Sequence, residues 1–186
     1  LTAAALAGCA VLEPAPSTDQ VAAFSANREG AVAPRGWQPL VITRAKAPTH
    51  YRLVYDEGAS SVVVHARAER SATGLKQPLD VDAAARPRVA WRWRVQDLIA
   101  GADNLDRHAE DSPVRLLLFF DGDKGRLPAR DHGQWKHFER DYVADYERAF
   151  GERPGRLIGI GIMTDTDNTG AEIEAFYGDI ELRSAS

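Results

Sequence analysis

Residues 164–170, with the sequence TDTDNTG, hold the densest set of oxygen ligands in the chain. Carboxylate, amide and hydroxyl oxygens are the ligands that calcium prefers, and their spacing here matches the first half of a calcium-binding loop. The full EF-hand pattern fails, because the twelfth position from Asp165 is Phe176 where a bidentate Glu is needed. Asp165 and Asp167 are therefore candidate calcium ligands that need partners from elsewhere in the chain. A loop whose side chains cap its own backbone is an equally strong alternative.

Two arginines form a second candidate site. Residues 88–95 alternate with period two, which places Trp91 and Trp93 on one face of a strand and Arg92 and Arg94 on the other. Two core tryptophans behind two solvated arginines explain this pattern, and an arginine-lined groove for an anionic or sugar ligand is the alternative. Loops at strand ends carry function on a rigid scaffold, so residues 165–168 are expected to form the rim of any site. The candidate ligand-binding residues are Arg92, Arg94, Asp165, Asp167 and Asn168.

Catalytic signatures are mostly absent from the sequence. It contains no Gly-x-Ser-x-Gly elbow, no glycine-rich phosphate loop and no His-Glu-x-x-His motif, and its five histidines share no metal-ligand spacing. Paired carboxylates for glycoside hydrolysis could be drawn from Asp121, Asp123, Asp165 and Asp167, although a sequence does not give their separation. We assign no catalytic residue and no certain cofactor, with calcium as the one candidate ion.

Two glycines interrupt the apolar run at residues 157–163 (LIGIGIM). The alternation predicts a strand with three isoleucines on one face and Gly159 and Gly161 on the other. Glycine weakens a strand, so its repeat implies that a bulky ring, a helix backbone or a ligand fills the space above it.

These candidate residues are positioned by short β-type runs that recur between turn signals. The strands are predicted at residues 37–43, 50–55, 61–66, 70–77, 88–95, 114–120, 157–163 and 176–182. One helix is predicted at residues 134–150, where Trp135, Phe138, Tyr142, Tyr146 and Phe150 recur every three or four positions. The prediction is one mainly β domain over residues 21–183, a jelly-roll or galactose-binding-like β-sandwich with one amphipathic helix.

The single cysteine, Cys9, follows Leu6-Ala7-Gly8, which matches a bacterial lipoprotein processing box. Residues 1–9 are therefore interpreted as part of a signal peptide, with Cys9 as the lipidation site and residues 10–20, rich in Pro, Ala and Ser, as a flexible tether. The alternative is an apolar chain end with a free thiol. The interpretation predicts a bacterial cell envelope protein, anchored to a membrane through the lipid on Cys9 and facing the periplasm or the exterior.

Composition excludes several classes of protein. Of the 186 residues, 44% are hydrophobic and 27% are charged, which is typical of an ordinary globular domain and not of a disordered chain. The net charge of -4 argues against a nucleic-acid partner, because neutralising phosphates requires a basic surface.

Several stretches resemble a bacterial family known only as domain of unknown function number 3047. They are residues 36–37 (GW), 71–75 (SATGL), 78–81 (PLDV), 91–95 (WRWRV), 141–146 (DYVADY), 149–151 (AFG), 163–170 (MTDTDNTG) and 177–180 (YGDI). The resemblance implies an exported bacterial domain and supplies no activity. It also implies a further β-rich segment after the acidic turn near Asp123, where this chain has only residues 124–134, so that strands of one sheet would be missing. Residues 176–182 are similar to the last strand of jelly-roll carbohydrate-binding modules.

The function expected from these features is a non-enzymatic ligand-binding module of the envelope, with a glycan as the leading ligand. A glycan hydrolase that uses the acidic loop residues and a structural envelope protein are the alternatives.

Overall fold

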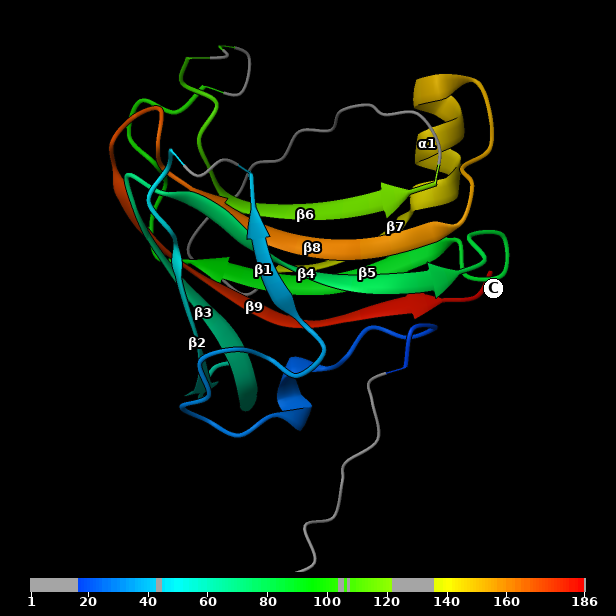
Figure 1. Cartoon of the computed structure of the whole chain (residues 1–186), viewed down its shortest axis with the longest axis horizontal. Coiled ribbons are helices and arrows are strands. Elements are labelled where there is room, and N and C mark those ends of the chain that lie inside the picture. The colour runs from blue at the N-terminus through cyan, green and yellow to red at the C-terminus, as the bar shows by residue number, and fades with distance from the viewer. Residues whose placement is uncertain (1–16, 43–44, 104–105, 107, 122–135, 186) are drawn as a thin grey trace, which may run out of the picture.

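Two antiparallel sheets pack face to face in the computed structural model, which describes residues 17–42, 45–103, 106, 108–121 and 136–185 (Figure 1). One sheet has the order β1 (Gln38–Val41), β4 (Ala72–Val81), β8 (Leu157–Asp165) and β6 (Ser112–Phe120). The other has the order β2 (His50–Asp56), β3 (Ser61–Glu69), β9 (Glu172–Arg183), β5 (Arg88–Val95) and β7 (Lys136–Asp141). A 3-10 helix η1 (Phe24–Ala26) and one α-helix, α1 (Tyr142–Phe150), complete the described elements. The prediction of a mainly β sandwich with one helix is confirmed.

The core lies between the sheets and comes from alternate positions of the strands. Ile160 and Ile162 of β8 are fully buried, as are Val64 of β3 and Val95 of β5, and Tyr177 of β9 is 2% exposed. Burial of such side chains supplies about 1.5–3 kcal/mol each and is the main stabilising term of the sandwich.

The two glycines of β8 lie on the outer face of their sheet, and a ring covers them. A Cβ atom on Gly161 would lie 3.0 Å from the Leu75 carbonyl oxygen and 3.3 Å from the Phe119 ring, and one on Gly159 would lie 3.4 Å from the same ring. Phe119 of the neighbouring strand β6 is therefore the bulky ring that the glycine repeat implied.

One detail of the β8 prediction is wrong. Ile158 is 44% exposed while Leu157 is fully buried, because the register of β8 shifts against β4 and β6 near this end and reverses the alternation.

The predicted helix over residues 134–150 is also wrong in its first part. Residues 136–141 form strand β7, and Phe138 stacks on Trp91 and Trp93 of β5 with ring centroids 5.2 and 5.8 Å apart. The helix begins only after Asp141, whose carboxylate accepts a 2.8 Å hydrogen bond from the Ala144 N–H. It ends as predicted at Gly151, which adopts a left-handed conformation with φ of 75°.

The described chain begins at one end of the sandwich. The Asp80 N–H donates to the Thr18 carbonyl at 2.7 Å, and the Gln77 side chain donates to the carbonyl oxygen of Gln20 at 2.9 Å. Residues 17–20, predicted to lie in the tether, thus pair with the end of β4. The chain enters at the same end as the C-terminus (Figure 1). No helix in the described ranges is long and apolar enough to cross a membrane.

Replacing Trp93 with alanine tests the part of the core where Trp93 of β5 packs on Phe138 of β7. Trp93 is 5% exposed and stacks on Phe138, so Trp93→Ala is expected to lower the free energy of unfolding by about 3–5 kcal/mol through cavity formation. Urea denaturation followed by far-ultraviolet circular dichroism measures the loss. Val41→Ala is the control, because Val41 is 54% exposed on an edge strand and should cost less than about 1 kcal/mol. Equal stability of the Trp93 variant and the wild type would contradict this core assignment.

Candidate functional site

Three carboxylates meet where β8 ends. Asp165 is the last residue of β8, Asp167 lies in the following loop, and Asp111 precedes β6. One oxygen of each lies within 4.8 Å of the others. Antiparallel pairing of β6 with β8 brings this about, because Ser112 is opposite Asp165 in the register. This acidic cluster, Asp111, Asp165 and Asp167, is the candidate site.

Asp165 is held by an arginine on the neighbouring strand. Its two carboxylate oxygens accept hydrogen bonds from Nε and an Nη of Arg115, both at 3.0 Å, and one of them also accepts the Ser112 N–H at 3.2 Å. Burial raises the pKa of Asp165 to about 6, although the charge of Arg115 and its hydrogen bonds oppose the rise. Desolvation therefore outweighs the ion pair in this site.

Asp111 fixes the loop between β8 and β9. It is 1% exposed, and its carboxylate accepts the N–H of Asn168 at 2.9 Å and both the N–H and hydroxyl of Thr169 at 2.6 Å. Asp167 pairs with Lys46 from the connection between β1 and β2. The Asn168 side chain, in contrast, is exposed. The loop is thus rigid and presents one amide to solvent.

Buried hydroxyls next to the acidic cluster bond the two sheets to each other. The Tyr177 hydroxyl lies 2.6 Å from that of Thr164 and donates to the Met163 carbonyl at 2.7 Å. Tyr51 donates to the Thr73 carbonyl at 2.7 Å, and Thr49 donates to the Thr164 carbonyl at 2.9 Å. Because buried polar groups are costly unless they are bonded, this network fixes the positions of the strand ends.

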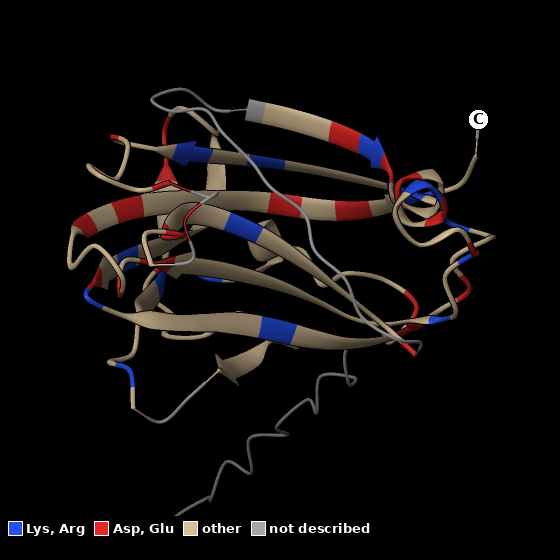
Figure 2. Ribbon diagram, turned by 90° about the horizontal axis from the view of Figure 1, so that it is seen from above, with Lys and Arg blue, Asp and Glu red and all other residues tan. Residues whose placement is uncertain are grey.

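The structure brings together only part of the predicted ligand-binding set. Asp165, at the end of β8, lies next to Asp167 and Asn168 in the loop that follows. Arg92 and Arg94 lie on the outer face of the five-stranded sheet, where basic positions of β5 run beside acidic positions of β9 (Figure 2). Arg94 pairs with Asp56 at 2.6 Å and its guanidinium lies 4.1 Å from the centre of the Phe176 ring.

Arg92 has a different position on the same outer face. It crosses over Gly178, where an added Cβ atom would collide with it, and an Nη lies 3.5 Å from the Ala59 carbonyl oxygen. The alternating strand is explained either by core tryptophans with arginines on the outer face or by an arginine-lined groove. The arrangement matches the first explanation, because Trp93 is buried and Trp91 packs against the core.

Sequence reasoning missed one carboxylate of the acidic cluster and the two cations that pair with the other two. Asp111, Arg115 and Lys46 lie roughly 50 or more residues from the positions that they contact. Each is a common charged residue with no local pattern, and only the strand register assigns it a partner. Lys46 lies outside every predicted strand, so no hydrophobic alternation in the sequence indicates where its side chain lies.

The donor set fits a calcium ion in part. Three carboxylates converge, as an oxygen-binding ion requires. However, Asp165 is bonded to Arg115, Asp111 to backbone amides, and Asp167 to Lys46. Lys46 supplies a positive charge at the cluster, and its side chain is 38% exposed, so it is the group that could give way to a cation.

The ionisation of Asp165 predicts a pH dependence of stability. Its pKa is about 6 in the folded chain and about 3.9 in an unfolded one. The folded state binds this proton more tightly, so the stabilisation is complete below about pH 4 and is lost as the pH rises through 6. Relative to Asp165→Asn, the free energy of unfolding of the wild type should fall by roughly 2–3 kcal/mol between pH 4 and pH 7. Urea denaturation at several pH values measures this difference, and a flat or rising difference would contradict the assignment.

Comparison with known families covers both sheets and the site. Residues 35–132 and residues 128–181 match the family described as protein of unknown function (DUF3047). The two segments overlap at residues 128–132, in the connection between β6 and β7, and each of the nine strands of the described chain lies at least partly inside them. No curated protein matches the chain. The matched segments include the acidic cluster and the loop that it holds, and the chain belongs to the DUF3047 family.

Proposed function

We propose that this domain is a non-enzymatic ligand-binding module of the bacterial cell envelope, and that it binds a glycan through residues 165–170. The observation that carries the proposal is the convergence of the acidic cluster, whose three carboxylate oxygens lie within 4.8 Å of one another beside the exposed Asn168. Carboxylates and amides are the groups that hydrogen-bond sugar hydroxyls, and Asp167 is the more accessible carboxylate of the loop.

Rigidity of the loop supports this proposal. The backbone of Asn168 and Thr169 is bonded to Asp111, and Thr166 donates its N–H to the Ser71 carbonyl at 3.0 Å. A loop that is already ordered pays little conformational entropy when a ligand binds, which favours affinity. A turn that only connects β8 to β9 would not require a buried carboxylate to hold its backbone.

We further propose that the sandwich is a jelly roll of the kind found in galactose-binding and other carbohydrate modules. Three strand pairs nest one inside another in sequence, namely β3 with β9, β4 with β8 and β5 with β7. Such nesting is expected when a long antiparallel hairpin is wound into two sheets. A complete jelly roll has one further strand between β6 and β7 in sequence, and residues 122–135 at that point lie outside the described part of the chain.

The position of the loop also suits a tethered module. Ala72, at the start of β4, is opposite Asp165, and Asp80, near its end, is bonded to Thr18. Because β4 spans ten residues, or roughly 30 Å, the loop and the N-terminal segment lie at opposite ends of the sandwich. A lipid on Cys9 would thus leave the loop directed away from the membrane.

A glycan hydrolase is the second candidate, favoured by the raised pKa of Asp165, which suits a general acid. Catalytic carboxylates of glycosidases lie roughly 5–10 Å apart. Asp121 does not meet this condition with Asp165, because it follows β6 at the other end and donates its N–H to the Arg156 carbonyl; Asp123 is outside the described residues. Asp165 is also only 5% exposed. Release of sugar from an envelope glycan, lost in Asp165→Asn, would favour the hydrolase.

A structural role without a small ligand is the third candidate. The ring of Phe119 covers Gly159 and Gly161, so this face offers no groove above the glycines.

Glycan binding tests the leading proposal. Asn168→Ala and Asp167→Asn are expected to weaken binding to envelope glycan fragments by about tenfold or more each, because each removes a hydrogen-bonding group from the rim. Isothermal titration against fragments chosen from a glycan array measures the change. Glu57→Gln, in the exposed turn between β2 and β3, is the matched control and should bind as the wild type does. The titration is repeated with calcium and with a chelator, and loss under chelation would make calcium part of the site.

An array with no binding glycan, or variants that bind as tightly as the wild type, would reject the loop as a glycan site.

Membrane recovery tests the location. In cells that express the chain behind a complete signal peptide, the wild type is expected in the membrane fraction. Cys9→Ser is expected in the soluble fraction, because it lacks the thiol to which the anchoring acyl chains would be attached. Immunoblots of the two fractions measure this. Equal recovery of both proteins in the membrane would reject lipidation at Cys9.

A further inference from the structure

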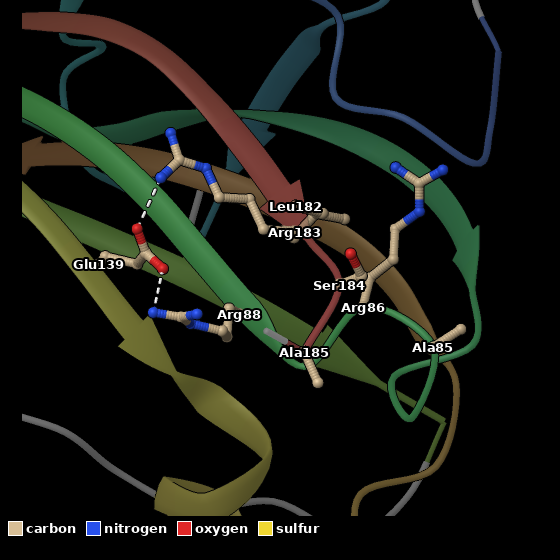
Figure 3. A pocket seen from close by; sticks show the side chains of 8 residues that line it. All are labelled: Ala85, Arg86, Arg88, Glu139, Leu182, Arg183, Ser184 and Ala185. Carbon is tan, nitrogen blue, oxygen red and sulfur yellow. Dashed lines mark hydrogen bonds and ion pairs between the residues drawn. The ribbon is translucent and has the colours of Figure 1, made fainter.

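An open hollow of about 810 Å³ is lined by residues of the β4–β5 turn and of the end of β9, close to where Thr18 of the first described segment is bonded to Asp80. It is lined by the β4–β5 turn, the start of β5, β7 and the end of β9, through Ala85, Arg86, Arg88, Glu139, Leu182, Arg183, Ser184 and Ala185 (Figure 3). Three arginines and one glutamate give the lining a formal charge of +2 (3 − 1), whereas the whole chain carries -4. This arginine hollow is thus a basic site on an acidic protein.

A single carboxylate organises two of the arginines. Glu139 pairs with Arg88 through one oxygen and with Arg183 through the other, the second contact at 2.6 Å (Figure 3). Arg183 also reaches Glu181 at 2.7 Å. Such pairing fixes the direction of long side chains that would otherwise be free, and so lowers the entropy that they lose when they bind a ligand.

The third arginine has no such partner. Within the described part of the chain, the side chain of Arg86 makes no hydrogen bond or ion pair, and Figure 3 shows it apart from the Glu139 group, beyond Ser184. The hydroxyl of Ser184 also lines the hollow. An unpaired guanidinium has its five N–H donors available in a planar fork, which matches the oxygens of a phosphate group.

The hollow lies at the same end of the domain as the segment that a tether would join. Thr18 is bonded to Asp80 at the end of β4, and the β4–β5 turn that follows carries Arg86. From Cys9 to Ser17 the chain can reach at most about 28 Å. If Cys9 carries a lipid, as proposed above, the tether keeps this end of the domain closer to the membrane surface than the acidic cluster at the other end.

We propose that the arginine hollow binds the phosphate of anionic lipid headgroups and docks this end of the domain on the membrane surface. The inference rests on the proposed tethering at Cys9 for its biological setting, but the headgroup contact is independent of the acyl chain. Arginines near an anionic surface each strengthen binding about fivefold, an effect that falls off within a Debye length.

Vesicle binding of the full chain, purified without its lipid, tests the proposal. The wild type is expected to co-sediment with phosphatidylcholine vesicles that contain 30 mol% phosphatidylglycerol, a chosen composition, and not with pure phosphatidylcholine. The triple variant Arg86→Gln, Arg88→Gln, Arg183→Gln should partition at least about tenfold more weakly. The charge-matched control is Arg52→Gln, Arg67→Gln, Arg70→Gln, none of which lines the hollow, and it should bind as the wild type does. Thermal melting of each variant confirms that it is folded.

Three results would overturn the inference. Equal loss in both triple variants would indicate attraction by overall charge, and absence of binding to the anionic vesicles would remove the headgroup contact. Stabilisation of the wild type by inorganic phosphate without vesicle binding would assign the hollow to a soluble phosphate. Glycan binding at the opposite end and fractionation of Cys9→Ser are measured separately, so their failure is distinguishable from failure here.

Discussion

A buried carboxylate must be compensated, and much of the local structure follows from this constraint at Asp165. The cost of removing its charge from water is large, and Arg115 on β6 offsets part of it through two hydrogen bonds. That contact requires β6 and β8 to be in register, which in turn brings Asp111 under the following loop. Next to this site, the hydroxyls of Thr164 and Tyr177 bond β8 to β9 of the other sheet. Two adjacent groups of bonds at the end of one strand, those of Asp165 and those of Thr164, thus join β8 to β6 and to the other sheet.

The sequence predicted most of the fold because period-two alternation is a local property. The strand at residues 88–95 has the predicted bounds, and Trp93 is buried as predicted. The failure at β7 has a physical cause: Phe138 fits the spacing of the helix aromatics, but its partners are Trp91 and Trp93 on a strand far away in sequence. The spacing of aromatic residues on one segment does not show whether that segment will pack as a helix or pair as a strand, because this depends on side chains elsewhere in the chain.

The site was less predictable than the fold. Residues 164–170 were recognised by their ligand types, since oxygen-rich side chains follow one another in the sequence. The groups that decide their chemistry are Asp111, Arg115 and Lys46, and these are defined only by contacts across strands. Arg92 and Arg94 show the converse limit. Their alternation with tryptophans gave the correct face of the strand, but it did not give the distance from the loop, because that depends on which sheet contains the strand.

One strand, β4, joins the two ends of the domain, and this arrangement has a mechanical consequence. A load applied between the loop after Asp165 and the chain at Ser17 would pull in the direction in which β4 and β8 run, and the hydrogen bonds between these two strands are perpendicular to that direction. All of these bonds then bear the load together in shear, instead of opening one after another from an end. Forced unfolding is governed by the rate of crossing the unfolding barrier, and a shear geometry raises the force needed to cross it. If the loop binds a ligand while Cys9 is anchored, as proposed above, tension between the two would load the sheet in shear.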